Sequence, residues 1–387
     1  MNLQFENLKS LFDIPDDVTY LNCSYMSPML KNALEAGIEG LKLKTRPWSI
    51  QSHDFFSVTE EVRSLAANII NCDPHDIALI PSASYGLATA ASNLSIADTE
   101  QIIVLEEEFP SNFYVWQELS KVSGASLITV PRPTNSSWTE AIICMINQNT
   151  KIAVLPHCHW TDGSLIDLEL IGKHLRKHDA ALVVDATQSL GTMPFDVTRV
   201  QPDFLISACY KWLLGPYSTG LLYVSQKYQQ GTPIEFNWIN RANAHDFRHL
   251  TSYQTSYAEG ARRYDVGERA NFALLPALMV GLQQIIEWGI ESIYETISHL
   301  TNVAAQQAEI RGLAVTKKEA RAGHFFGIQL PSNTPDNLTR QLSEQNIFIS
   351  IRGNSLRITP HVYNSEQDLE ILFKALDRIK WKHDFRL

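Results

Sequence analysis

The chain has 387 residues, of which 44% are hydrophobic and 19% charged, so it is long enough for one large and one small globular domain. Its formal net charge of −10 argues against nucleic acid and anionic membrane surfaces as partners. No apolar run approaches the roughly 18 residues of a membrane-spanning helix. Five cysteines without CxxC spacing, and an N-terminus without a signal-peptide pattern, predict a cytoplasmic protein.

Over the first two-thirds of the chain, short apolar runs alternate with amphipathic stretches. The amphipathic stretches at residues 87–93, 112–122 and 168–178 predict helices. Apolar runs of strand length occur at residues 77–80, 102–105, 127–130, 152–155, 181–185, 204–207 and 220–224. This alternation predicts an α/β fold with a largely parallel central sheet and helices on both faces. Ligands of such sheets bind at the carboxyl ends of the strands.

After about residue 260 the pattern changes. Residues 271–287 predict a long helix, in which Pro276 marks either a kink or a late start. Further strands are predicted at 325–330, 347–351 and 356–359, and a terminal amphipathic helix at 367–381. We therefore expect an N-terminal arm (1–19), a large α/β domain (20–260) and a smaller α+β C-terminal domain (261–387).

Two polar residues near predicted strand ends indicate the chemistry. Asp185 ends the buried strand 181–185, and Lys211 follows the strand 204–207. Taken singly, they also fit an ordinary strand-end acid and a solvated lysine. A buried carboxylate needs a partner, however, and a pyridinium about 4 Å away would contribute roughly 4 kcal/mol at an effective dielectric of 20. Together they indicate a pyridoxal phosphate (PLP) site, where the lysine forms a Schiff base and the acid keeps the pyridine nitrogen protonated.

On these residues the chain resembles the fold-type-I PLP-dependent enzymes of the aminotransferase class V family, which includes cysteine desulfurases, kynureninases and isopenicillin N epimerase. The resemblance extends from residues 20–22 to residues 357–364, and its core is the spacing of Asp185, Gln188 and Lys211. It implies that Lys211 is the catalytic Schiff-base lysine and that Asp185 binds the pyridine nitrogen. It also implies that Gln188 hydrogen-bonds the phenolic oxygen of the cofactor.

Four further residues match cofactor contacts of the family. The resemblance implies that Phe109 stacks on the pyridine ring, although a lone phenylalanine is more often a core residue. Ser84 and Tyr85 match the turn that holds the phosphate, which suits the free N–H groups of a helix N-terminus; an ordinary helix cap is the alternative. Tyr210 would bond the phosphate or serve as a core tyrosine.

Two arginines match the substrate side of the site. Arg357 lies between two apolar residues and therefore needs an anion partner, either the substrate carboxylate or a structural acid. Arg352 is a second candidate for the same task. Trp160 either packs near the ring or fills the core. The run His157-Cys158-His159 invites a metal site, which we reject because no further ligands with matching spacing lie nearby.

The resemblance implies a PLP-dependent enzyme that acts on the α-amino group of a small amino acid, as an aminotransferase or a C–S or C–C lyase. An epimerase of the isopenicillin N type is the alternative, and a non-catalytic nucleotide-binding module lacks support because no G-x-G-x-x-G motif is present. No cysteine follows Cys209, which argues against a persulfide-forming desulfurase. The family also implies a homodimer with the active site near the subunit interface, where residues 265–271 depart from the usual Gly-Thr.

Overall fold

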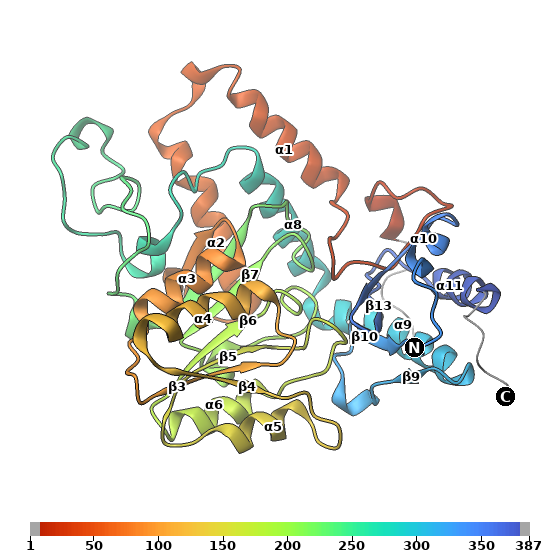
Figure 1. Ribbon diagram of the computed structural model, residues 1–387. Coiled ribbons are helices and arrows are strands. Elements are labelled where there is room, and N and C mark those ends of the chain that lie inside the picture. The colour runs from red at the N-terminus through yellow and green to blue at the C-terminus, as the bar shows by residue number, and fades with distance from the viewer. Residues whose placement is uncertain (1–7, 380–387) are drawn as a thin grey trace.

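The computed structural model describes residues 8–379 and is built around a seven-stranded sheet (Figure 1). In spatial order its strands are β2 (Ile77–Ile80), β8 (Gly220–Val224), β7 (Phe204–Ala208), β6 (Ala181–Asp185), β5 (Thr150–Pro156), β3 (Gln101–Leu105) and β4 (Ser126–Val130). Neighbours from β7 to β4 are parallel, whereas β8 is antiparallel to both β7 and β2. The predicted largely parallel sheet is therefore confirmed, and every predicted strand is present.

Both faces of this sheet are buried, and that is why its strands read as continuous apolar runs. Along β6, Leu182 and Val184 join the core on one face, and Ala181 and Val183 join the core on the other. This alternation follows from the two-residue period of a strand. Only Asp185, at the carboxyl end of β6, breaks the apolar run.

Helices cover the two faces of the sheet. On one side, α3 (Ala83–Asn93) and α4 (Pro110–Ser123) contribute to the core cluster. The opposite cluster contains residues of α1 (Lys31–Leu43), α2 (Ser57–Ile70), α5 (Trp138–Met145), α6 (Leu168–Arg176), α7 (Val197–Val200) and α8 (Leu274–Trp288). Helix α8 begins two residues before Pro276, in the first turn, where a missing N–H breaks no intrahelical bond. Of the two predicted roles of Pro276, a late start of the helix is therefore correct, and a kink within the helix is not required.

The C-terminal part of the chain forms a second, smaller sheet beside the first (Figure 1). Its antiparallel strands are, in order, β12 (Ser350–Arg352), β13 (Ser355–Ile358), β10 (Phe326–Gln329) and β9 (Ala314–Val315). They share a separate core with α9 (Ile290–Ile310), α10 (Leu338–Ser343) and α11 (Glu366–Arg378). Within residues 8–379, no helix combines the length and the apolar character needed to cross a membrane.

The structure divides one predicted strand in two. Of the predicted strand 347–351, β11 (Ile347–Phe348) pairs in parallel with β1 (Thr19–Tyr20), and only β12 joins the second sheet. Helix α8 packs against α1 and α2, although it follows the expected boundary at residue 260. The division into arm, large domain and small domain stays a prediction. Residues 1–7 of the arm and 380–387 of the terminal segment lie outside the described residues.

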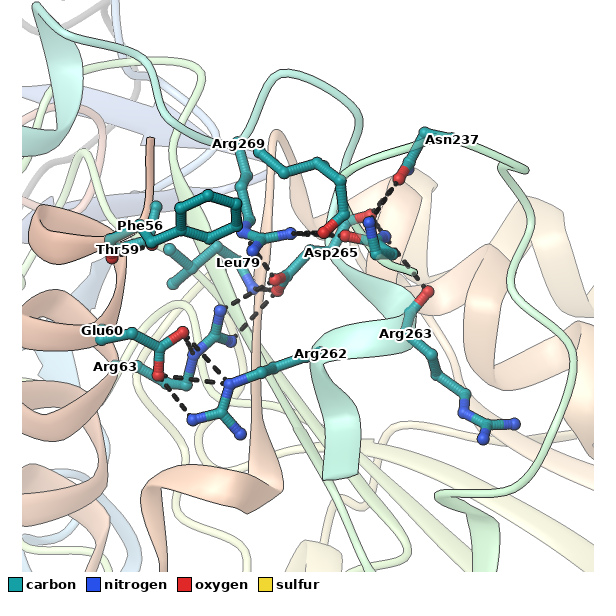
Figure 2. Close-up of polar contacts among 12 residues, drawn as sticks. Phe56, Thr59, Glu60, Arg63, Leu79, Asn237, Arg262, Arg263, Asp265 and Arg269 are labelled. Carbon is teal, nitrogen blue, oxygen red and sulfur yellow. Dashed lines mark hydrogen bonds and ion pairs between the residues drawn. The ribbon is translucent and has the colours of Figure 1, made fainter. Parts of the chain in front are cut away.

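A buried cluster of charged side chains ties the edge strand β2 to the segment after residue 260 (Figure 2). Asp265, whose side chain is fully buried, accepts hydrogen bonds from Arg63 Nη2 at 2.8 Å and from the backbone N–H of Leu79 at 2.7 Å. A second ion pair joins Asp265 to Arg269 Nε at 3.1 Å. One carboxylate therefore holds helix α2, strand β2 and residues 265–269 in register.

Candidate active site

Parallel strand ends bring the two key residues into one cavity. Strand β6 ends at Asp185, and the neighbouring parallel strand β7 ends three residues before Lys211. Because parallel strands end at the same edge of a sheet, both side chains reach the same space. They line a cavity of about 220 Å³, together with Phe109, Gln188 and Tyr210.

Asp185 is a buried acid with no cation in ion-pair distance among residues 8–379. Its Oδ1 accepts a hydrogen bond from the backbone N–H of Thr187 at 3.0 Å. Burial raises the pKa of Asp185, while the Thr187 hydrogen bonds and the positive charge of Lys211 oppose that rise. A cationic ring nitrogen in the cavity would remove this cost of burial.

Lys211 is buried to 6% exposure beside aromatic rings. Its Nζ lies 5.6 Å from the ring centroid of Phe109 and 5.5 Å from that of Tyr210. Burial lowers the pKa of Lys211 to about 8, against the opposing effect of Asp185. The positive charges of Arg357 and Arg352 contribute to this lowering of the pKa. A substantial fraction of the amine is therefore neutral and nucleophilic near pH 8.

The side chain of Gln188 is held in one orientation by two neighbours. Trp212 Nε1 donates to Gln188 Oε1 at 3.1 Å, and Gln188 Nε2 donates to the carbonyl oxygen of Ser24 at 3.1 Å. Since an indole N–H can only donate, the amide oxygen must face Trp212. Gln188 therefore has one further N–H with which to donate into the cavity that it lines.

Two aromatic rings form another wall of the cavity. Phe109 and Trp160 both line it and meet edge to face, with ring centroids 5.5 Å apart and an interplanar angle of 80°. Trp160 Nε1 donates to the carbonyl oxygen of Glu107 at 2.6 Å, which fixes the indole against the loop before α4. Trp160 thus lies at the site, while the predicted stacking of Phe109 on the cofactor stays a prediction.

The predicted phosphate residues are placed differently from one another. Ser84, in the first turn of α3, lines the cavity together with Ser218 and Thr219 from the turn before β8. Tyr85 is not among the lining residues, and burial, together with the nearby charge of Glu235, raises the pKa of its hydroxyl. The backbone N–H of Tyr85 instead donates to the capping side chain of Ser82 at 3.2 Å. Tyr210 lines the cavity, and its ring centroid lies 4.7 Å from that of Tyr217.

The two arginines lie on neighbouring strands of the second sheet. Arg357 is buried on β13, where Nη2 and Nε donate to Ser350 Oγ at 2.7 and 3.1 Å and Nη1 donates to the carbonyl oxygen of Trp160 at 3.1 Å. Burial lowers its pKa to about 9, and Arg352 adds to that effect. The structural acid considered as its partner does not exist among residues 8–379.

Glu108 is a cavity residue that sequence reasoning missed. It is 8% exposed, and its Oε1 accepts from the backbone N–H of Phe109 at 2.7 Å. Its other oxygen has no hydrogen-bond partner in the part of the chain that the structure describes. Burial, with a contribution from the charge of Asp185, raises the pKa of Glu108 to about 8 against the effect of the Phe109 amide. The position of Glu108 just after strand β3 was the available signal.

The adjacent histidines do not act together. His157 makes its hydrogen bond with Ser189 Oγ at 3.2 Å, whereas His159 contacts Thr161 Oγ1 at 2.7 Å and the carbonyl oxygen of Glu106 at 3.1 Å. Burial lowers the pKa of both imidazoles, so each stays neutral. Across residues 8–379, no group of His, Cys, Asp and Glu side chains is arranged to hold a metal ion.

The residues present suit PLP. A buried amine and a buried acid line the same cavity without forming an ion pair, which leaves space between them for a ring. Gln188 offers a donor to that space, and Ser84, Ser218 and Thr219 offer hydroxyl groups near the first turn of α3. Such a turn has free backbone N–H groups and favours an anion such as a phosphate.

Comparison with known sequences gives the same assignment. The family model described as Aminotransferase class-V matches residues 42–370. An uncharacterized aminotransferase, YcbU of Bacillus subtilis, is 25% identical over 97% of this chain and 98% of its own length. The kynureninase of Geobacillus thermodenitrificans is 23% identical over 90% of this chain and 83% of its own. A probable cysteine desulfurase of Pyrococcus abyssi is 25% identical, with 83% and 82% covered.

Solved structures confirm the predicted fold class. A C-DES mutant with glycine covalently linked to its PLP cofactor matches with a TM-score of 0.87 at 19% identity, over 97% of this chain and all of the other. The apo cysteine desulfurase of Thermococcus onnurineus matches with a TM-score of 0.79 at 20% identity, over 97% and 98%. The chain therefore belongs to the aminotransferase class-V family and is a PLP-dependent enzyme of the transaminase or lyase type.

Proposed function

We propose that this enzyme acts on the α-amino group of a small amino acid, as an aminotransferase or as a C–S or C–C lyase. The observation that carries the proposal is the shared cavity of Lys211 and Asp185, which lie on neighbouring strand ends without pairing. PLP, when bound, supplies an electron sink for the bonds of the substrate α-carbon. An amino-acid epimerase remains the alternative.

The side chains of the cavity divide the work. Lys211 would hold the cofactor and carry the substrate α-proton on Nζ, which its lowered pKa favours. Asp185 would hold the proton on the pyridine nitrogen, and Gln188 would donate to the phenolic oxygen. Phe109 would cover the ring, and Arg357 would bind the substrate carboxylate. Ser84 and Tyr210, with the first turn of α3 that includes Tyr85, would hold the phosphate.

The cysteines of the site weigh against a desulfurase that carries its product on a thiol. Cys23 and Cys158 are fully buried near Lys211, and burial raises the pKa of both thiols. A protonated thiol is a poor nucleophile. A lyase that releases its product directly needs no such cysteine, and the structural neighbour C-DES is described as a cystine C–S lyase whose reaction product is cysteine persulfide.

Cofactor attachment tests the first step of this proposal. Purified protein supplied with PLP should be yellow, and borohydride should fix the cofactor onto the peptide that contains Lys211. The Lys211→Ala variant should lose both properties, whereas Lys227→Ala, a control on the far side of β8, should keep them. A protein that stays colourless and unlabelled with excess PLP would refute the assignment.

The reaction class requires a second assay. A panel of amino acids would be scored for keto acid with ammonia or sulfide in the absence of an acceptor, and for conversion of the cofactor to its pyridoxamine form. Stoichiometric pyridoxamine without an eliminated product identifies the aminotransferase. Catalytic elimination without an acceptor identifies the lyase, and exchange of the α-proton with loss of chirality alone identifies the epimerase.

We further propose that the enzyme is a homodimer with the cavity near the subunit interface. Helix α1 exposes Leu34, Ile38 and Leu41 to 53%, 43% and 61%, a spacing that places them on one face. Tyr217, which lines the cavity, is 64% exposed at its mouth. The Leu41→Glu variant should sediment as a monomer, and Ile310→Glu, on the far helix α9, should not. An unchanged Leu41→Glu dimer would exclude α1 as the interface.

The cellular setting is also a proposal. All five cysteines are free thiols, which is the usual state in the reducing cytoplasm. We therefore propose a cytoplasmic enzyme whose partners are a small-molecule substrate and a second copy of the chain, without nucleic acid or membrane. Fractionation of cells that express the tagged chain would test this placement.

A further inference from the structure

Two arginines that have no acidic partner in residues 8–379 lie on the same face of the hairpin formed by β12 and β13. The register pairs Ser350 with Arg357 and Arg352 with Ser355, so the two arginines are diagonal neighbours. In an antiparallel pair of strands, the backbones of diagonal neighbours on one face are about 7–8 Å apart. The other face carries Leu356, which packs into the core of the second sheet. Both guanidinium groups therefore leave the sheet on its polar face.

Arg352 has unused hydrogen-bond donors. Its Nη1 donates to the carbonyl oxygen of Ile351 at 2.8 Å, and no acid lies within ion-pair distance among residues 8–379. The acids of the neighbouring loops are already engaged elsewhere, because Glu107 and Asp162 both pair with Arg132, at 2.8 and 2.6 Å. Arg352 is thus a cation whose fork of N–H groups has no anion to bind.

Trp160 connects both arginines to the cofactor cavity, which it lines and they do not. Its ring lines the cavity, and its face carries the guanidinium of Arg352 at 5.9 Å from the ring centroid. Its carbonyl oxygen accepts from Arg357 Nη1 at 3.1 Å. Both positive charges act on Lys211, whose pKa they lower. Two cations beside a buried amine form a strongly positive region that an anionic ligand would neutralise.

We propose that the substrate is an amino acid with a second acidic group at the end of a short side chain. Arg357 binds its α-carboxylate, and Arg352 binds the side-chain acid, which is a carboxylate or another anionic oxygen group such as a sulfinate or phosphate. The inference rests on the proposed function and narrows its substrate class. Planar guanidinium groups bind such groups through two parallel hydrogen bonds.

The test compares substrates that differ in the side-chain charge alone. Holoenzyme would be titrated with L-aspartate and L-asparagine, and binding would be read from the visible absorption of the cofactor, beside kcat/KM for each. Cysteine sulfinate and phosphoserine, against serine, would identify which acidic group is preferred. We expect aspartate to bind about 10- to 100-fold more tightly than asparagine, because charged hydrogen bonds contribute on that scale.

Variants of the hairpin separate the two roles. Arg352→Gln should lower the affinity for aspartate to that for asparagine and change the affinity for asparagine by no more than about twofold. The affinity of Arg352→Lys for aspartate should lie between those of wild type and Arg352→Gln. Arg357→Lys should weaken both substrates alike. The control Arg340→Gln, an exposed arginine of α10 paired with Glu344, should change neither.

Three results would overturn the inference. The first is a wild-type enzyme that processes neutral amino acids and treats aspartate, cysteine sulfinate and phosphoserine no better than their neutral partners; the proposed function would then stand alone. The second is an Arg352→Gln variant that weakens aspartate and asparagine equally. The third is a holoenzyme whose spectrum responds to no amino acid, which would refute the proposed function itself.

Discussion

Substitution of Asp265 by asparagine should be among the most destabilising single changes in this protein. The carboxylate pairs with Arg63 and Arg269, whose side chains are 0% and 2% exposed (Figure 2). Each pair is worth about 4 kcal/mol for charges about 4 Å apart at an effective dielectric of 20. Removal of one partner of a buried ion pair costs about 3–5 kcal/mol, because the remaining charge stays buried without compensation. We expect Asp265→Asn to lose a similar amount.

Urea-induced unfolding, followed by tryptophan fluorescence, would measure that loss of unfolding free energy. The exposed Asp246, which pairs with His249 at the surface, provides the control, and Asp246→Asn should leave the unfolding transition nearly unchanged. The double variant Asp265→Asn with Arg269→Met should recover part of the loss, because it removes Arg269, which unlike Arg63 has no second ion pair with an acid such as Glu60 among residues 8–379. An Asp265→Asn protein as stable as Asp246→Asn would refute the electrostatic reasoning.

Substitution of Asp265 should also weaken the retention of PLP at the cofactor site. Residues 266–269, which directly follow Asp265, line a hollow together with Ser218 and Thr219, and these two residues also line the cofactor cavity. If the charged cluster positions this segment, Asp265→Asn should release PLP faster than the control variant at a temperature where both remain folded. Equal rates of PLP release would limit the cluster to a stabilising role.

Three other predictions concern the cavity. The folded pKa of Lys211 is about 8 and the ordinary lysine value is 10.5, so between these pH values the unfolded apo chain binds more protons than the folded one. The unfolding free energy of apo wild type should therefore rise relative to that of Lys211→Met, by roughly 3 kcal/mol from pH 8 to pH 10.5, in urea titrations at fixed pH. Glu108 should change the unfolding free energy in the opposite direction, because its folded pKa of about 8 lies above the ordinary 4.5. Wild type should lose stability relative to Glu108→Gln as the pH rises from 4.5 to 8, and parallel plots of unfolding free energy against pH would exclude a neutral buried acid. Trp212→Phe removes the donor to Gln188 and should weaken PLP binding about 2- to 10-fold in equilibrium dialysis, an effect that an unaltered dissociation constant would disprove.

Much of the fold was predictable because its determinants are local. All seven strands of the large sheet were predicted because each contains a short apolar run, which in all of them but the edge strand β4 is almost completely buried. The pairing of β1 with β11 was not predicted, because its two short segments lie more than 300 residues apart and neither has a pattern of its own. For the same reason residues 347–351 looked like one strand. The long helix α9 was also missed.

The site divides in the same way. Asp185 and Lys211 could be selected from the order of residues, because a polar group at the end of a buried strand is conspicuous and parallel strands end at one edge. Their roles toward PLP follow from the family. The position of the Tyr85 hydroxyl near Glu235 and the burial of Glu108 depend on neighbours that are distant in the sequence.

The two arginines show the difference most clearly. Sequence reasoning offered Arg352 and Arg357 as rivals for one carboxylate, because nothing in the residue order distinguishes two cations five positions apart. The hairpin register places them on one face, and the pairing of Glu107 and Asp162 with Arg132 leaves both without an acidic partner among the described residues. Local apolar patterns in the sequence determine which helices and strands form. Which charges remain unpaired depends instead on contacts that only the folded chain creates.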